Sequence, residues 1–396
     1  MDRRTTLANR LRAAREALGL TQAEVARALG VHRPTISEIE AGRRAVTSDE
    51  LYEFARIYAI PVHALLTDPL PDQEDVERVL FRRGGELTAQ VRTAVRRFME
   101  QCRAEKELED LLGFERPHEE RPGYLARPPK NRGEAVRQGE RIAQQERSRL
   151  ELGEQPLRNP IALLERQGVR VGPLDLEKGE DLDGVYFETQ SLGAAIGINP
   201  RRDAGTGFRS AFTAAHEYAH WLLRDVTVEE YRFKEAVGNL GEVRANAFAA
   251  AFLMPEQGLR AYFRDRGLSG KTGTIDHLGP GDLVRAMDYI GVSRIALLYR
   301  LQNVGLLEPE RAEELRAFEF PITKTARALG LRFRRDPSLG ARLPTLAVEA
   351  WRKGLISTGR AADLLGLDIQ TFRERMRVIG EQPEDETPLL GAASRR

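Results

Sequence analysis

The chain has 396 residues, 31% of them charged and 41% hydrophobic, and its formal net charge is +1. This length predicts roughly two to four domains, and the hydrophobic share is high enough for packed cores rather than overall disorder. The nearly neutral charge excludes a protein that coats nucleic acid or membranes through bulk electrostatics.

Two further classes of protein are excluded by composition and hydropathy. The single cysteine, Cys102, rules out an intramolecular disulfide and a zinc site built from several cysteines. The amino-terminal segment has no apolar stretch typical of signal peptides, and no window approaches the roughly 20 apolar residues that span a membrane. We therefore expect a cytoplasmic protein without a membrane partner.

Residues 1–68 have the pattern of a small domain of five short helices. Thr21, with Glu24 three residues later, predicts a capping box at the start of the second helix. Apolar residues recur at helical spacing in five segments separated by glycine or proline: Leu7–Leu18, Val25–Leu29, Ile36–Ile39, Leu51–Tyr58 and His63–Leu66.

Within this domain, residues 18–43 read LGLTQAEVARALGVHRPTISEIEAGR. Ala26 is a small residue where two helices would cross, and Gly30 would form the turn between them. The segment resembles the XRE/Cro-like helix-turn-helix family through L-T-Q-x-E-x-A-x-x-L-G-V and I-S-x-I-E-x-G-R. The resemblance implies binding of double-stranded DNA by residues 1–68, with the helix after Gly30 in the major groove.

The side chains expected at the DNA are polar or basic. They are Gln22, His32, Arg33, Thr35, Ser37, Arg43 and Arg44. Residues 1–66 hold ten arginines against eight acidic residues, so a single copy should bind weakly, and a homodimer or a second module is expected. The alternative use of this motif is protein contact.

Residues 69–154 are rich in charges of both signs. Two helical stretches flank a loop with four prolines at 115–132. We interpret this region as a charged helical connector, a solvated spacer arm.

The pattern becomes mixed in the region that we assign to the next domain, 155–310. Short strands are predicted at Val169–Val171, Gly184–Phe187 and Ala194–Asn199, and helices at Ser210–Leu223 and Gly241–Leu253. A compact α+β unit is therefore expected. The strand 194–199 is either a buried structural strand or one that binds extended substrate by strand addition.

The first of these helices contains FTAAHEYAHWLL, residues 212–223. His216 and His220 are four residues apart, so their imidazoles lie on one helical face, and Glu217 lies between them. Two imidazoles suit zinc, and a nearby carboxylate can take a proton from an activated water. This is the H-E-x-x-H signature, and it stands out in a chain with only six histidines.

A catalytic zinc needs a third protein ligand. We prefer Glu242, which opens GEVRANAFAAAFLMP, because the apolar run behind it would pack that helix against the core: Ala245, Phe248, Ala249 and Phe252. Asn246, one turn later, would be a hydrogen-bonding support. The rival third ligands are Glu229, Glu230, Glu235 and His277. Tyr218, Tyr231 and Asn246 are candidate donors to the oxyanion that forms during peptide hydrolysis.

Together, the segments FTAAHEYAHWLL and EVRANAFAAAFLMP resemble the ImmA/IrrE family of metallopeptidases over roughly residues 155–310. The resemblance implies a minimal thermolysin-like zincin fold, with His216, His220 and Glu242 as zinc ligands and Glu217 as general base. It also implies a protein substrate, a DNA-binding repressor of the helix-turn-helix kind that controls stress-response or mobile-element genes.

Residues 311–380 are again helical, and 381–396 are expected to be a disordered tail. TQAEVARALGVHRPTI (21–36) aligns without gaps with STGRAADLLGLDIQTF (357–372), which makes this region a candidate second helix-turn-helix. Any two helices joined by a glycine turn would look similar, which is the alternative. The predicted fold is multidomain and mainly α: a five-helix domain, a central α+β zincin and a carboxy-terminal helical region.

Three functions remain open on the sequence. The first is a zinc endopeptidase brought to DNA, or to a DNA-bound repressor, by its helix-turn-helix domain. The second is a transcription regulator that uses the zincin fold as a sensor or dimerisation unit without proteolysis. The third is an antitoxin that represses its own genes. Glu217 between two potential ligands favours the first, because a scaffold needs no general base there.

Overall fold

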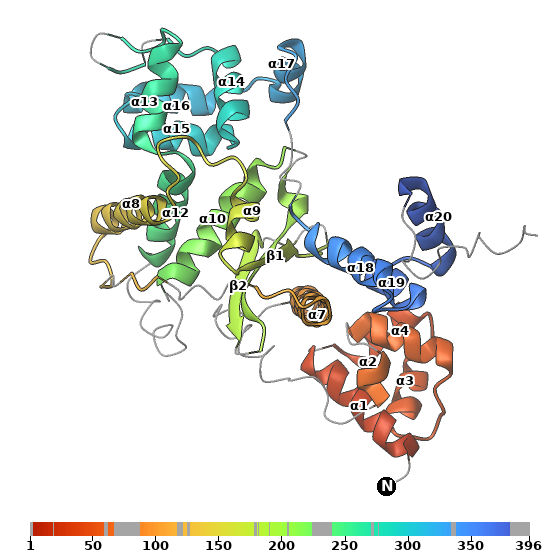
Figure 1. The fold of residues 1–396 in the computed structure, drawn as a ribbon. Coiled ribbons are helices and arrows are strands. Elements are labelled where there is room, and N and C mark those ends of the chain that lie inside the picture. Colours follow the sequence, from red (N-terminus) through yellow and green to blue (C-terminus); the bar gives the residue numbers. More distant parts are fainter. Residues whose placement is uncertain are drawn as a thin grey trace, which may run out of the picture.

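The computed structural model is multidomain and mainly helical, with one small sheet (Figure 1). It describes residues 3–18, 20–58, 62–66, 88–116, 122–124, 127–177, 180, 182–189, 191–203, 206–223, 240–270, 273–275, 277–333 and 338–380. The predicted tail, 381–396, lies outside these residues. None of the described helices is long and apolar enough to cross a membrane.

The amino-terminal domain has the five helices that the sequence predicts. They are α1 (Arg3–Ala17), α2 (Gln22–Leu29), α3 (Arg33–Glu40), α4 (Ser48–Tyr58) and α5 (Val62–Leu66). The capping box of Thr21 and Glu24 is present, and Gly30 ends α2 in the left-handed conformation (φ 68°), which favours glycine. A core that includes Leu11, Val25, Ile36 and Phe54 is buried between the helices.

The spacer-arm interpretation of residues 69–154 is wrong for the part that the structure describes. α7 (Ala89–Leu112) packs Phe98 and Met99 against the sheet, and α8 (Arg132–Arg149) places Ile142 in the main core. α8 lies so close to α12 (Leu240–Leu253) that a Cβ on Gly139 would meet the Arg244 carbonyl oxygen at 2.3 Å. Both helices therefore belong to the body that holds the predicted site.

The sheet has three strands in the order β1-β3-β2. β1 (Arg170–Pro173) runs parallel to β3 (Gly193–Ile198), and β2 (Gly184–Thr189) runs antiparallel to it, with Tyr186 opposite Ile196. β3 is central and paired along both edges, so it is the buried structural strand, and substrate addition to it is ruled out. Within this sheet, β2 has an unpaired edge.

The remaining helices of the central region surround one large core. They are α9 (Pro160–Arg166), α10 (Phe208–Leu223), α12, α13 (Glu256–Asp265), α14 (Pro280–Ile290), α15 (Arg294–Asn303) and α16 (Pro309–Ala317). The core continues past both predicted limits of the domain, to Ile142 upstream and Leu315 downstream. α10 and α12 pack against each other in its centre, which brings the two sequence segments that carry the predicted site together.

Four helices complete the chain: α17 (Ile322–Ala328), α18 (Arg342–Arg352), α19 (Thr358–Leu364) and α20 (Ile369–Ile379). α17 packs on α14, whereas α18 packs on α7 through Leu346, Ala347 and Ala350 against Leu108. In Figure 1, α20 lies at the outer end of this group, away from the sheet.

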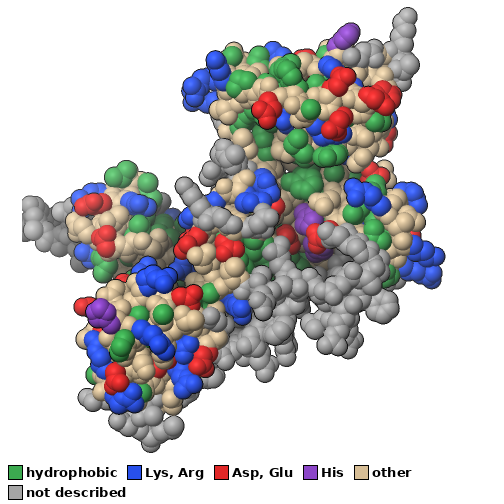
Figure 2. Space-filling model, turned by 180° about the vertical axis from the view of Figure 1, so that it is seen from behind, with side chains coloured by type: hydrophobic (Ala, Val, Ile, Leu, Met, Phe, Trp, Pro, Cys, Tyr) green, Lys and Arg blue, Asp and Glu red, His purple; other side chains and the backbone are tan. Residues whose placement is uncertain are grey.

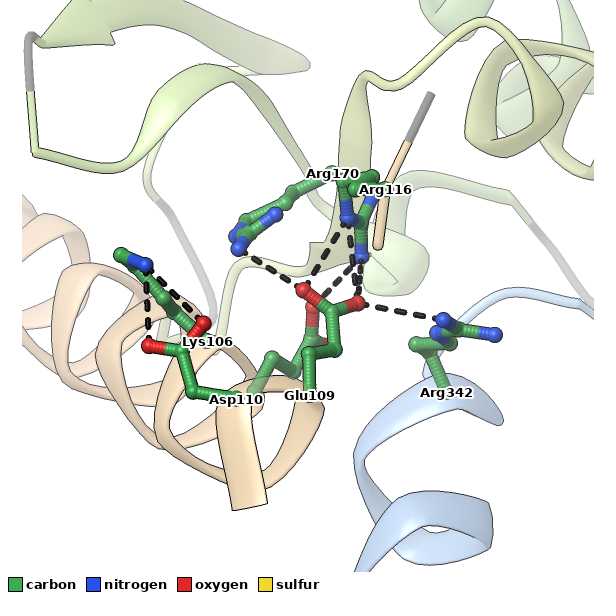
Figure 3. Close-up of polar contacts among 7 residues, drawn as sticks. Lys106, Glu109, Asp110, Arg116, Arg170 and Arg342 are labelled. Carbon is green, nitrogen blue, oxygen red and sulfur yellow. Dashed lines mark hydrogen bonds and ion pairs between the residues drawn. The ribbon is translucent and has the colours of Figure 1, made fainter. Parts of the chain in front are cut away.

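α7 makes polar contacts with three parts of the molecule, of which those of Glu109 are buried. Glu109, 2% exposed, accepts hydrogen bonds from Arg116, from Arg170 of β1 at 2.9 Å and from Arg342 of α18 at 3.1 Å (Figure 3). Nearer its start, α7 contacts the amino-terminal domain, because Arg97 donates to the Arg56 carbonyl oxygen at 3.3 Å. α7 therefore contacts the sheet, the amino-terminal domain and the carboxy-terminal helices.

Candidate metal centre

α10 presents two imidazoles at one point of its surface. His216 and His220 are one helical turn apart, and their Nε2 atoms lie 3.1 Å from each other. The opposite face of α10 is apolar and packs into the main core, which holds the helix in place. The two nitrogens are therefore fixed side by side, as ligands of one ion would be.

A carboxylate from the second helix completes the cluster. Glu242 lies in the first turn of α12, with Oε2 3.1 Å from Nε2 of His216 and Oε1 3.4 Å from Nε2 of His220. Hydrogen bonds from the two imidazoles hold the pKa of Glu242 far below its usual range. Its side chain is 48% exposed, so the cluster opens toward solvent on this side.

Among the described residues, this is the one group of three or more potential ligands whose donor atoms converge, all within 4.8 Å. Two imidazoles and one carboxylate form the donor set of gluzincin-type zinc sites. Of the rival third ligands, His277 is exposed and outside the cluster, and Glu229, Glu230 and Glu235 lie outside the described residues. Figure 2 shows histidine side chains beside an acidic side chain in a recess of this face.

Asn246, one turn after Glu242 on α12, supports the first imidazole. Its Oδ1 lies 3.1 Å from Nδ1 of His216. When Nδ1 carries the proton and donates to this oxygen, Nε2 is left with its lone pair toward the cluster. The amide therefore fixes both the tautomer and the ring orientation of His216.

We expect Asn246→Ala to weaken metal binding by about 10- to 100-fold, because His216 would lose the group that orients it. Competition with a coloured chelator measures the affinity. Asn246→Asp is the matched control, since its carboxylate can still accept from Nδ1 and should keep most of the affinity. Equal affinity of Asn246→Ala and the wild type would contradict this role.

Glu217 follows His216 on α10 and is buried against the sheet. A Cβ on Gly184 of β2 would lie 3.1 Å from Oε1 of Glu217 and 2.5 Å from Cγ2 of Thr213. Only glycine at position 184 lets β2 approach α10 this closely. Our sequence reasoning missed Gly184, although a glycine at the start of a predicted strand was a visible signal.

Tyr218 cannot be the oxyanion donor that the sequence suggested. It is fully buried, and its hydroxyl donates to Oε1 of Glu146 at 2.5 Å. Burial and the nearby Glu146 carboxylate raise the pKa of Tyr218 well above its usual value. Tyr124 donates to the other oxygen of Glu146, so this carboxylate ties α10 to α8 and to the loop before it. Tyr231, the other tyrosine proposed for this role, lies outside the described residues.

The predicted DNA-contacting residues fall into two groups. His32 and Arg33 are exposed at the start of α3, and Thr35 and Ser37 are partly exposed one turn later. The other three make contacts within the domain: Gln22 donates to Glu40 (2.9 Å), Arg43 pairs with Glu38 (2.7 Å), and Arg44 pairs with Glu50 (2.8 Å).

Arg43, Arg44 and Gln22 differ in how easily they can leave their partners within the domain to contact DNA. The Arg43 and Arg44 ion pairs lie at the surface and contribute little to stability, so DNA phosphates can displace Glu38 and Glu50 at small cost. Gln22 is different, because its partner Glu40 is buried and paired with Arg15 at 2.6 Å. Its amide therefore helps to hold α2 against α3.

Comparison with known families agrees with both halves of this description. Residues 11–65 match the family model described as helix-turn-helix, and residues 164–302 match the peptidase family model described as IrrE N-terminal-like domain. No curated protein and no solved structure matches the chain significantly. The chain therefore combines an amino-terminal, XRE-like helix-turn-helix domain with a central region similar to the IrrE N-terminal-like domain of a peptidase family.

Proposed function

We propose that the protein is a zinc-dependent endopeptidase. The observation that carries this proposal is the convergence of His216, His220 and Glu242, with donor atoms within 4.8 Å. Glu217, which is buried, directly follows His216 on α10. A bound zinc ion would supply the electrophilic part of peptide hydrolysis, by polarising a water and the scissile carbonyl.

The chain's own residues would then handle the protons. Glu217 accepts a proton from the attacking water and delivers it to the amine that leaves. Asn246 keeps His216 in the tautomer that can ligate. The sheet has two edge strands, β1 and β2, because β3 has a partner on each side. Of these two, β2 is the one that packs on α10, so its free edge is the one that could pair with an extended peptide.

The helix-turn-helix domain suggests where the substrate is found. A peptidase fused to a DNA-binding domain acts at DNA, and the substrate we propose is a DNA-bound repressor of the helix-turn-helix kind. Its cleavage in the cytoplasm would switch on stress-response or mobile-element genes. The resemblance to the ImmA/IrrE family supports this choice of substrate.

A substrate trap tests the proposal. Full-length Glu217→Gln would be expressed in the native host with an affinity tag, and the proteins bound to it identified. We expect a repressor that the purified wild-type protein cleaves and that Glu217→Gln leaves whole. If the variant regulates its genes normally and the wild type cleaves no captured protein, the protein is a non-proteolytic regulator or antitoxin.

A further inference from the structure

We propose that α18–α20 form a second helix-turn-helix that binds double-stranded DNA, with α20 as its recognition helix. This inference goes beyond the proposed peptidase and does not depend on the metal centre. It rests on the local geometry of α19 and α20, on the charge of α20 and on the position of α18 on α7.

The turn between α19 and α20 has the same local structure as the turn between α2 and α3. Corresponding residues of the two turns are 336 positions apart in the sequence. Ser357 caps α19 by accepting from the Arg360 amide at 3.1 Å, as Thr21 caps α2 by accepting from the Glu24 amide at 3.2 Å. The glycine after each first helix is left-handed: φ is 63° at Gly366, against 68° at Gly30.

Backbone bonds and burial follow the same offset. The Leu367 amide donates to the Ala362 carbonyl oxygen at 2.9 Å, and in the amino-terminal domain the Val31 amide donates to the Ala26 carbonyl oxygen at the same distance. Within the aligned segments 21–36 and 357–372, the buried residues also correspond: Ala361, Ala362 and Phe372 in the second, Val25, Ala26 and Ile36 in the first. A chance glycine turn explains the turn itself but not the matching cap and core.

α18 supplies the third helix that a helix-turn-helix needs to bury its core. Trp351 of α18 packs edge-on against Phe372 of α20, with ring centroids 5.1 Å apart. Met376 joins the same small cluster. The unit therefore has a three-helix core of its own.

The second recognition helix is more basic than the first. α20 carries Arg373, Arg375 and Arg377, all exposed, and one acid, Glu374, which accepts from Gln370. None of these three arginines forms an ion pair within the described part of the chain. α3, by comparison, has one arginine and two glutamates. When a recognition helix lies in the major groove, its exposed arginines can bind the negatively charged phosphates of the DNA backbone. The charge of α20 therefore favours DNA over a protein as the partner.

α7 places the two helix-turn-helix units on one support. Its Arg97 contacts α4 of the first unit, while Glu107 pairs with Arg360 and Glu109 with Arg342 of the second (Figure 3 shows Arg342). Once one unit is bound to DNA, the other is held close to the same duplex at a high effective concentration. The affinity of the whole chain for DNA is therefore higher than that of either unit alone. The single chain thereby has the second module that the weakly charged first unit requires.

The test measures DNA binding by full-length Arg373→Ala/Arg377→Ala with a random-sequence duplex of about 40 base pairs, enough for two half-sites. If two phosphate contacts are lost, the slope of log K against log salt concentration should become shallower by about 1.8, where K is the association constant for DNA. Binding should weaken roughly 10- to 100-fold near 0.1 M salt. Arg264→Ala/Arg311→Ala is the matched control, because it removes the same charge from exposed arginines on α13 and α16.

Two outcomes would overturn the inference. One is a variant with the affinity and salt dependence of the control. The other is a variant that keeps its DNA affinity but loses self-association in light scattering, which would make α20 a protein-contact surface. Arg373→Gln/Arg377→Gln, which keeps a polar side chain at both positions, should reproduce the loss of DNA affinity. Circular dichroism checks that the helices persist.

Discussion

Glu217→Gln is expected to bind zinc as the wild type does and to cleave the substrate about 100- to 10,000-fold more slowly. The amide fills nearly the same volume against Gly184 and Thr213, so β2 and α10 keep their distance. It cannot accept a proton from water, which removes general-base catalysis but no metal ligand. Single-turnover cleavage of the trapped repressor, together with metal content, measures both effects.

The control for this variant is Glu188→Gln. Glu188 lies on the same strand as Gly184 and accepts from Trp221 of α10. Its replacement by glutamine removes a carboxylate charge from the β2–α10 contact, keeps an oxygen that can accept from Trp221, and leaves the ligands untouched. We expect it to keep most of the activity. A Glu217→Gln enzyme as fast as this control would show that another group moves the proton.

The largest effect on stability is expected from Glu109→Ala. The carboxylate is buried among Arg116, Arg170 and Arg342 (Figure 3), and Arg170 is itself only 4% exposed. Removing the anion leaves the buried Arg170 guanidinium without the carboxylate that it pairs with, whereas Arg116 keeps Glu105 at 3.5 Å. Loss of one partner of a buried ion pair typically costs about 3–5 kcal/mol. Denaturant unfolding measures the free energy, and hydrogen exchange should show that α18 loses protection first.

Asp110→Asn is the matched control on the same helix. Asp110 is exposed and pairs with Lys106 at 2.9 Å, a surface ion pair worth at most about 1 kcal/mol. If both variants lose the same small amount of stability, Glu109 does not hold the junction together.

Local patterns predicted much of this molecule. The five amino-terminal helices and the convergence of His216 and His220 depend on spacing within helices, which a sequence displays directly. The pairing of α10 with α12 is not local, but the apolar face behind Glu242 was enough to indicate it.

The misses have physical causes as well. α7 and α8 look like a solvated spacer because charges surround narrow apolar stripes, yet Phe98 and Ile142 are buried. Strand order depends on contacts between distant segments, so no pattern showed that β3 is central. Tyr218 is two residues after His216, about 200° around the helix, and therefore faces the core. That error was avoidable.

The most direct test of the central claim is the metal content of the purified full-length protein, with His220→Ala purified in parallel. Elemental analysis after dialysis against metal-free buffer should give about one zinc per wild-type chain and almost none in His220→Ala, which loses one of three ligands. Zinc absent from the wild type, even after incubation with zinc and removal of the excess, or zinc unchanged in His220→Ala, would contradict the account of His216, His220 and Glu242 as a catalytic metal centre.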